Sequence, residues 1–370
     1  MSENKSKNDI IIMHDTFLYK WWWERLILMM AKALKSDLAS GFFSKWSFDL
    51  RKEWFNWKLI SVSSEIYKKW FRHIKLKLAF LFNTKFLKNY KTVIFSWDSI
   101  SSVRNCWKDT KKIYYCHTPP RYLYDLRELY SKKVPYILRP IFSILSYIFK
   151  KMYESDISKM DLILTNSINT QKRIKLFLGL DSTVLYPPVN LEEFRFLWQK
   201  DYYLSFARLS SVKRVDKVAQ AFTKMPDKKL IIIYWENDPE YSSVFDIVEW
   251  YKNIEMITLY WNKWFTEYVW NCIATIYIPV DEDFWMSPVE SMAAWKPVLW
   301  VNDWWLKESL IDKKTWVLIK TEASIEDIIA WVNYLSVKRS LEMQIDCENR
   351  AKDFSLWEFE TKLKKLVFIK

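Results

Sequence analysis

Glycine is almost missing from this chain, which has 2 glycines among 370 residues. An average usage of about 7% would give roughly 26. Glycine supplies the bends with positive φ and the close backbone approaches on which α/β ligand sites depend. A chain so short of glycine either lacks such sites or has other residues at those bends.

Tryptophan occupies positions where such bends are expected, and its count of 23 is high. The two residue types together are about as numerous as glycine alone in an average chain. The positions that we interpret as glycine positions include Trp21, Trp22, Trp23, Trp97, Trp285, Trp295, Trp300, Trp304, Trp305 and Trp316. We hypothesise that most of these tryptophans come from UGA codons that the organism decodes as glycine. The alternative is a genuinely tryptophan-rich protein.

Paired cysteines, a signal sequence and long apolar runs are also lacking. The four cysteines show no paired spacing, which indicates neither a zinc site nor a disulfide framework. The first nine residues, MSENKSKND, are polar and have no apolar signal core. No stretch reaches the roughly 18 uninterrupted apolar residues of a spanning helix. We therefore expect a cytoplasmic protein.

Length and charge narrow the class of protein. A chain of 370 residues has room for two domains of ordinary size. Lysine and arginine number 57 against 44 acidic residues, so the formal net charge is +13. Such a balance favours anionic partners, namely phosphates, nucleic acid or a lipid surface.

Short apolar strands alternate with amphipathic helices along the whole chain, which is typical of parallel-sheet α/β domains. We expect strands at 10–13, 58–62, 92–96, 112–116, 161–165, 183–186, 202–206, 229–233, 254–259, 274–279 and 297–301, and helices at 25–38, 71–87, 170–178, 217–222, 288–294, 324–335 and 354–367. Asn166-Ser167 is expected to cap the helix over 170–178 at its start, and Gly179 falls where its C-cap belongs. The stiff, extended pair Pro187-Pro188 marks the boundary between two domains.

A further helix is expected within residues 134–152, after two prolines. It carries apolar Ile141, Ile144, Leu145 and Ile148, followed by basic Lys150 and Lys151. One interpretation is a packed core helix with an exposed basic end. The other is a contact with a membrane surface.

Candidate ligand-binding residues follow two strands of the first half. His117 ends a strand and precedes two prolines that fix the next loop. Open α/β sheets bind ligands at the carboxyl ends of their strands, so we favour a functional His117 over a structural one. Trp22 and Trp23 lie between a strand and a helix. If they are glycine, they bring backbone N–H groups and a helix N-terminus to a phosphate or sugar; the alternative is an ordinary turn.

Candidate residues of the second half are charged. Arg208 and Lys213 follow a strand and could clamp a diphosphate, the first as a fork and the second as a point charge. Glu290 could accept two hydrogen bonds from a ribose diol, and Glu282 lies on the loop before it. Each could instead be a solvated surface charge. Their order and their placement after strands favour a site.

Taken together, these motifs resemble the family-four (group 1) glycosyltransferases, which are retaining enzymes of the GT-B fold. The resemblance covers nearly the full length. With glycine for tryptophan, it rests on residues 21–24 (GGGE), 208–213 (Arg-Leu…Lys), 282–290 (EDFGMSPVE), 294–298 (AGKPV) and 304–308 (GGLKE). Residues 115–122 (YCHTPPRY) resemble mannosyltransferases that build surface polysaccharide.

The resemblance implies an α/β fold with two Rossmann-like, doubly wound parallel-sheet domains that face a central cleft. Residues 1–188 would bind the acceptor and residues 189–350 the nucleotide sugar. A helix in residues 351–370 would pack back toward the first domain. The implied reaction is a hexosyl transfer, with mannose from GDP-mannose as the expected donor group, to a glycan or polyprenyl-linked acceptor.

Roles for single residues also follow from the resemblance. Arg208 and Lys213 would hold the diphosphate and stabilise the leaving group, and Glu290 would hold the ribose. His117 would contact the sugar near the reacting carbon. The remaining donor contacts would come from Glu282, with the backbone of Phe284, Trp285, Met286 and Ser287, and from Trp22 and Trp23 as glycine. The expected catalytic set is His117, Glu282, Arg208 and Lys213.

The family's usual mechanism is front-side attack, in which the leaving phosphate takes the acceptor proton. The two glutamates are therefore not a hydrolase pair. No cofactor and no metal are expected, because arginine and lysine supply the positive charge. If the tryptophans are genuine, the donor site is plugged.

Three other interpretations remain. The chain could be another GT-B enzyme, such as a nucleotide-sugar epimerase, or an inactive scaffold. It could also be a basic, aromatic-rich nucleic-acid binder, although the tryptophans gather at turns and not along one face. We expect as partners a nucleotide sugar and a glycan or polyprenyl-linked acceptor, with a peripheral contact at the inner face of the membrane and no nucleic acid.

Overall fold

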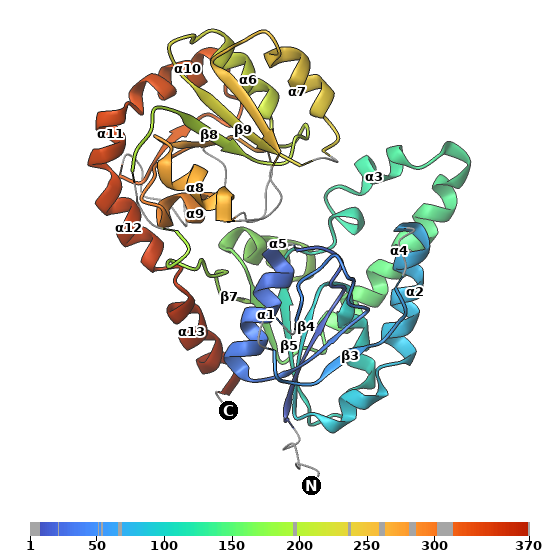
Figure 1. Cartoon of the computed structure of the whole chain (residues 1–370). Coiled ribbons are helices and arrows are strands. Elements are labelled where there is room, and N and C mark those ends of the chain that lie inside the picture. The colour runs from blue at the N-terminus through green and yellow to red at the C-terminus, as the bar shows by residue number, and fades with distance from the viewer. Residues whose placement is uncertain are drawn as a thin grey trace. The chain divides into compact units, whose positions relative to one another are not determined.

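The computed structural model describes residues 8–20, 22–50, 52, 55–65, 69–194, 198–235, 238–258, 263–280, 286–301 and 314–368. The chain divides into two compact units: unit 1 is Met1–Tyr186 with Glu360–Lys370, and unit 2 is Pro187–Phe359. Each unit is built on one parallel sheet (Figure 1). The predicted fold class, an α/β chain with two doubly wound parallel sheets, is confirmed.

Among the described residues, the sheet of unit 1 has seven parallel strands in the order β3-β2-β1-β4-β5-β6-β7. Their bounds are β1 Ile10–His14, β2 Asp37–Ser40, β3 Leu59–Ser61, β4 Thr92–Ser96, β5 Lys111–Cys116, β6 Leu162–Thr165 and β7 Thr183–Val184. The strand order reverses between β1 and β4. In such sheets the ligand crevice lies outside the carboxyl ends of the strands at this reversal.

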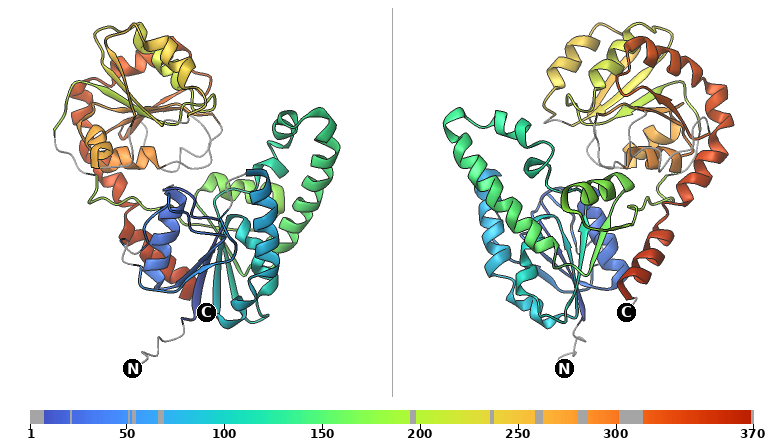
Figure 2. Two further views of the ribbon diagram at one scale, coloured as in Figure 1. Left: turned by 45° about the vertical axis from the view of Figure 1, so that its right-hand side comes forward. Right: turned by 180° about the vertical axis from the view of Figure 1, so that it is seen from behind.

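Helices cover both faces of this sheet, and its strand interiors are buried accordingly. The helices are α1 Trp22–Leu34, α2 Lys69–Phe82, α3 Arg127–Lys133, α4 Arg139–Ile157, α5 Ile168–Leu178 and α13 Leu356–Phe368, with short 3-10 helices η1 Lys85–Asn89, η2 Trp97–Asn105, η3 Arg121–Leu123 and η4 Tyr136–Leu138. Figures 1 and 2 show α1 and α13 on one face and α2 and α4 side by side on the other. Both predicted caps of α5 are confirmed. Ser167 Oγ accepts from Thr170 N at 3.1 Å, and Gly179 ends the helix with φ 70°.

Two predicted helices end earlier than expected. The helix predicted over 25–38 stops where Lys35 adopts φ 51° and the N–H of Ser36 donates to Ala31 O at 3.0 Å, and residues 37–40 form a strand instead. The helix predicted over 71–87 divides into α2 and η1. There the Thr84 hydroxyl donates to Phe80 O at 2.8 Å, a bond that bends helices.

The described part of unit 2 repeats this plan with six parallel strands in the order β10-β9-β8-β11-β12-β13. The strands are β8 Tyr203–Phe206, β9 Leu230–Tyr234, β10 Ile254–Thr258, β11 Thr275–Tyr277, β12 Val298–Val301 and β13 Trp316–Ile319; the helices are α6 Val215–Thr223, α7 Tyr241–Val248, α8 Lys263–Asn271, α9 Ser287–Ala293, α10 Ile325–Tyr334, α11 Val337–Glu342 and α12 Gln344–Lys352. Here the order reverses between β8 and β11. Within the described residues, no helix of either unit is long and apolar enough to cross a bilayer.

Candidate functional site

Three side chains meet at the strand-order reversal of unit 1. His14 ends β1, Ser96 ends β4 and His117 follows β5, and all three are at most 3% exposed. Ser96 Oγ lies 2.9 Å from His117 Nε2 and 3.2 Å from His14 Nδ1. The hydroxyl therefore links the two imidazoles. His117 is thus placed at the ligand edge of the sheet, where the sequence predicted it.

Electrostatics keep both imidazoles of this cluster neutral. Burial lowers the pKa of His14 from 6.5 to about 3, and burial together with the neighbouring His14 holds the pKa of His117 well below its usual value. Asp15, the next residue after β1, behaves in the opposite way. Burial and the charge of Asp98 raise its pKa from 3.8 to about 7. A neutral His117 cannot supply positive charge to a ligand, but it can donate or accept one hydrogen bond at each nitrogen.

Tryptophan rings pack against His117 and against one another. The ring of Trp97 stacks on the imidazole with centroids 4.9 Å apart, and Trp22 meets it edge-on at 5.7 Å. Trp23 contacts Trp22 and Trp97 at 5.8 and 6.1 Å. Trp22 and Trp23, two predicted donor residues, therefore lie beside His117 in the first turn of α1. As indoles they fill the space that glycine would leave open.

The loop between β1 and α1 closes on a buried carboxylate. Glu24, which is 1% exposed, accepts from the N–H groups of Leu18 and Tyr19 at 2.9 and 3.2 Å. Glu24 was expected only as the last letter of a GGGE-like segment. Its backbone bonds show that it fixes the loop from within, which is a structural task.

Arg208 and Lys213 lie on the loop after β8, at the strand-order reversal of unit 2. Arg208 Nε donates to Asp238 Oδ1 at 3.3 Å, and the Arg208 side chain is 42% exposed. Lys213 is 5% exposed; its Nζ lies 2.6 Å from the hydroxyl of Tyr277 on β11 and 5.2 Å from the centre of that ring. Both cations are therefore held at the ligand edge of this sheet, one partly open to solvent and one inside it.

Two residues that the sequence did not single out hold this loop in place. Asp238 Oδ2 accepts from Leu209 N at 2.9 Å and from Trp235 N at 3.1 Å. Arg214, at φ 53°, donates to the carbonyl oxygens of Ile278 and Thr321 at 2.7 and 2.6 Å. No spacing rule marks such backbone anchors, because their partners are distant in sequence.

Helix α9 carries the other described donor residues. Met286 precedes the first turn, Ser287 begins it, and both are buried; Glu290 is half-buried at the end of the same turn. The helix is tied to β11 by the hydroxyls of Thr275 and Ser291, 2.8 Å apart. Lys213 contacts the same strand at Tyr277, so the Lys213 loop and α9 both pack against β11.

Several predicted residues fall outside the described part of the chain. These are Glu282, Phe284 and Trp285 of the donor site, together with Trp21, Trp304 and Trp305. Their roles stay predictions.

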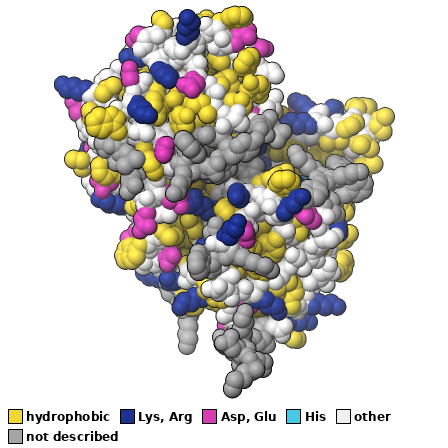
Figure 3. All heavy atoms as spheres, in the orientation of Figure 1, with side chains coloured by type: hydrophobic (Ala, Val, Ile, Leu, Met, Phe, Trp, Pro, Cys, Tyr) yellow, Lys and Arg dark blue, Asp and Glu magenta, His cyan; other side chains and the backbone are white. Residues whose placement is uncertain are grey.

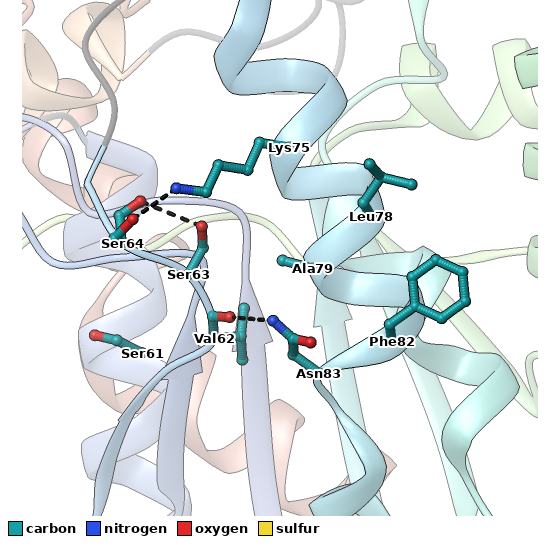
Figure 4. Close-up of a pocket in the computed structure, with 9 residues that line it drawn as sticks. All are labelled: Ser61, Val62, Ser63, Ser64, Lys75, Leu78, Ala79, Phe82 and Asn83. Carbon is teal, nitrogen blue, oxygen red and sulfur yellow. Dashed lines mark hydrogen bonds between the residues drawn. The ribbon is translucent and has the colours of Figure 1, made fainter.

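An open pocket of about 430 Å³ lies elsewhere in unit 1, between the loop after β3 and helix α2 (Figure 4). Lys75 Nζ reaches Ser64 Oγ at 2.6 Å across one end of it, and Asn83 donates to Val62 O at 3.0 Å. It contains none of the predicted site residues, and we assign it no role.

Comparison with protein families bears on the class of enzyme. Residues 191–354, less than half of the chain, match the family described as "Glycosyl transferases group 1". No curated protein sequence matches the chain.

Solved structures similar to the chain share its fold over nearly its full length. Sucrose-phosphate synthase from Thermosynechococcus elongatus is 10% identical, with a TM-score of 0.78 over 97% of this chain and 98% of that one. Anabaena Alr3699/HepE in complex with UDP and glucose is 10% identical, with a TM-score of 0.71 over 97% and 99%. WaaG, a glycosyltransferase involved in lipopolysaccharide biosynthesis, is 9% identical, with a TM-score of 0.68 over 98% and 100%.

At such low identity these likenesses show the fold alone, and that fold is GT-B. Residues 191–354 form a group 1 glycosyltransferase domain on it. The chain is a glycosyltransferase.

Proposed function

We propose that this glycosyltransferase is a retaining enzyme that moves mannose from GDP-mannose to a glycan or polyprenyl-linked acceptor in surface polysaccharide synthesis. The proposal of a nucleotide-sugar donor rests on two cations at the ligand edge of the unit 2 sheet. Arg208 is held there by Asp238, and Lys213 is held at Tyr277. A leaving nucleoside diphosphate gains negative charge in the transition state. Fixed cations at that point stabilise it without reorganisation. HepE, solved in complex with UDP and glucose, and the lipopolysaccharide enzyme WaaG have the same fold.

In the proposed mechanism, the diphosphate oxygen itself takes the acceptor proton. Arg208 and Lys213 balance its charge, so the proposal includes no metal and no cofactor. Glu290 holds the ribose, and Glu282 with the 284–287 backbone holds the sugar. His117 is neutral and serves as a hydrogen-bonding partner of the sugar, not as a charged group.

A transfer assay tests this proposal. Purified protein with glycine at the suspect tryptophans is given GDP-mannose, UDP-glucose or UDP-galactose, with and without a polyprenyl-linked acceptor. We expect acceptor-dependent release of GDP and an α-mannoside product. Release of UDP from a UDP-sugar, with no release of GDP, would show that the donor is a UDP-sugar. Epimerisation of the donor without acceptor would favour the epimerase alternative. Activity unchanged by EDTA is expected, and its loss would contradict the metal-free mechanism.

We infer that the working chain carries glycine at Trp97 and Trp295. Four residues other than glycine have positive φ among those described, and two of them are Trp97 at 58° and Trp295 at 62°. Tryptophan disfavours this conformation, and glycine does not. The indole N–H of Trp97 is moreover buried without a hydrogen-bond partner in the described part of the chain. Mass spectrometry of peptides from the native protein should find glycine at both positions; tryptophan at both would refute the inference.

We also propose a peripheral membrane contact, made by an apolar ridge on η4 and α4. The ridge consists of Tyr136, Ile137, Ile141, Ile144 and Ile148, which are 81, 84, 54, 61 and 45% exposed. The four isoleucines follow the i, i+4, i+7, i+11 spacing of one helix face. A packed core helix would bury these positions, so the exposure favours the membrane interpretation.

Basic residues flank the ridge at both ends. Lys132 and Lys133 end α3, and Lys150 and Lys151 follow the ridge on α4. Figure 3 shows apolar and basic side chains together over this part of unit 1. An apolar face beside lysines fits a bilayer with anionic headgroups.

Vesicle sedimentation tests the contact without any sugar chemistry. We expect binding to vesicles with anionic lipid, at least tenfold weaker binding to neutral vesicles, and a comparable loss for the double variant Ile141→Ser, Ile144→Ser. Ile345→Ser, at a 72% exposed site of unit 2, is the matched control and should bind normally. Equal binding of the double variant and the control would contradict the proposal.

A further inference from the structure

The number of protons in the His14–Ser96–His117 cluster limits which of its atoms can donate a hydrogen bond and which must accept one. Two neutral imidazoles and one hydroxyl share two contacts, Ser96 Oγ to His14 Nδ1 and Ser96 Oγ to His117 Nε2. A neutral imidazole carries one proton, on one of its two nitrogens, and the hydrogen bond at one nitrogen decides which. The remaining nitrogens, His14 Nε2 and His117 Nδ1, are buried and have no hydrogen-bond partner in the described residues.

The backbone beside His14 indicates where its proton lies. A backbone hydrogen bond to Thr16 raises the pKa of His14, as a carbonyl acceptor does, although burial lowers the pKa far more. Since Nε2 has no partner in the described residues, the nitrogen that donates is Nδ1. A protonated Nδ1 cannot accept from Ser96, so the Ser96 hydroxyl donates its proton to His117 Nε2. The proton of His117 is then left on Nδ1.

We propose that His14 and Ser96 are positioning residues that hold His117 as the neutral tautomer with its proton on Nδ1. His117 then presents a buried N–H donor at the strand-order reversal, suited to an oxygen of the bound ligand. It does not act as a base. Only the identity of that oxygen, a sugar hydroxyl or a diphosphate oxygen, rests on the proposed function.

The buried surroundings support a positioning role. Ser96 N donates to Ser99 Oγ at 3.1 Å, and Ser99 Oγ donates to Met13 O at 2.8 Å, so the main chain of Ser96 is tied to the end of β1. A bound ligand that accepts from His117 Nδ1 would supply the partner that this atom lacks among the described residues. A buried donor left unsatisfied is costly, and a ligand oxygen removes that cost.

Nitrogen NMR of the ligand-free protein tests the tautomer directly. The chain has three histidines, so His73→Gln leaves only the two imidazoles of the cluster to observe. We expect His117 with its proton on Nδ1 in this background. In Ser96→Ala we expect a shift of most molecules to the Nε2–H form, whereas Ser96→Thr, which keeps the hydroxyl, should retain Nδ1–H. An Nε2–H form before the Ser96 change, or a tautomer indifferent to Ser96→Ala, would overturn the proposal.

Ser102→Ala provides a matched control. Ser102 lies on η2 and, like Ser96, is fully buried, but its hydroxyl has no hydrogen-bond partner in the described residues. This variant should leave the tautomer unchanged; a shift there as large as in Ser96→Ala would contradict a specific role for Ser96. If Ser96→Ala does not fold, His14→Asn and His14→Leu replace it. Asparagine keeps a donor toward Ser96 and should retain Nδ1–H, and leucine should not. The NMR experiment contains no substrate, so a result that overturns the tautomer proposal leaves the donor proposal unaffected. Likewise, failure of the donor proposal leaves the tautomer proposal unaffected.

Discussion

Residue 295 allows a quantitative test of whether glycine belongs at the bends where this chain has tryptophan. Helix α9 ends in a Schellman motif: Lys296 N donates to Ser291 O at 2.9 Å, and Trp295 N donates to Met292 O at 2.9 Å. Residue 295 is therefore the left-handed position of the motif, with φ 62°. Gly179 occupies the equivalent place after α5 with φ 70°.

The comparison is between Trp295→Gly and Trp295→Ala, since both remove the indole and differ only by a Cβ. A left-handed conformation costs a residue with a Cβ about 1–2 kcal/mol, and glycine loses about 0.5–1 kcal/mol more in chain entropy. We expect the glycine variant to be more stable by about 1 kcal/mol. For a unit of this size that is about 2–4 °C in Tm.

Gly179→Ala tests the same difference in the free energy of unfolding in the opposite direction, because it adds a Cβ at a left-handed position. A Cβ at Gly179 would meet no atom within 4 Å, so only the backbone conformation contributes. We expect it to lose about 1 kcal/mol. Urea unfolding followed by circular dichroism measures all three variants. If Trp295→Ala were as stable as Trp295→Gly, the argument that this bend calls for glycine would be refuted.

The remaining predictions concern the two strand-order reversals. Trp97→Gly should increase the thermal stabilisation by donor or acceptor, because it removes the ring stacked on the neighbouring imidazole; an unchanged shift would argue against a plugged site. Lys213→Met should reduce kcat by about 100- to 1,000-fold, while Lys224→Met, an exposed lysine of the same unit, should not; equal rates would remove Lys213 from the mechanism. Because the folded-state pKa of His14 is depressed to about 3, the free energy of unfolding should fall on acidification from pH 6.5 toward 3, by up to about 3–5 kcal/mol. The raised pKa of Asp15 opposes this between pH 7 and 4, so Asp15→Asn should make the loss steeper, and a shallower loss would contradict the assignment.

Much of the fold could be predicted because its signals are local. Apolar runs of four to six residues mark the strands, and Ser167 and Gly179 mark the two ends of α5. Strand β2 was missed because its buried Asp37 looks like a surface residue until Tyr90, 53 positions away, is seen to donate to it at 2.8 Å.

The candidate site was predictable where a side chain follows a strand, as His117, Arg208 and Lys213 do. The residues that orient them could not be found in this way. Ser96 reaches His117 from another strand, and Asp238 reaches Arg208 across 30 positions. Such partners are brought together by the order of strands in the sheet, which residue spacing does not reveal.

The most direct test of the central claim is the thermal shift produced by activated sugars. Protein with glycine at the suspect tryptophans is heated with GDP-mannose, UDP-glucose or nucleotide alone, beside the same protein with Lys213→Met. We predict a concentration-dependent rise in Tm with GDP-mannose that Lys213→Met abolishes. No shift with any nucleotide sugar, or an equal shift in both proteins, would contradict a donor diphosphate site at the carboxyl end of β8.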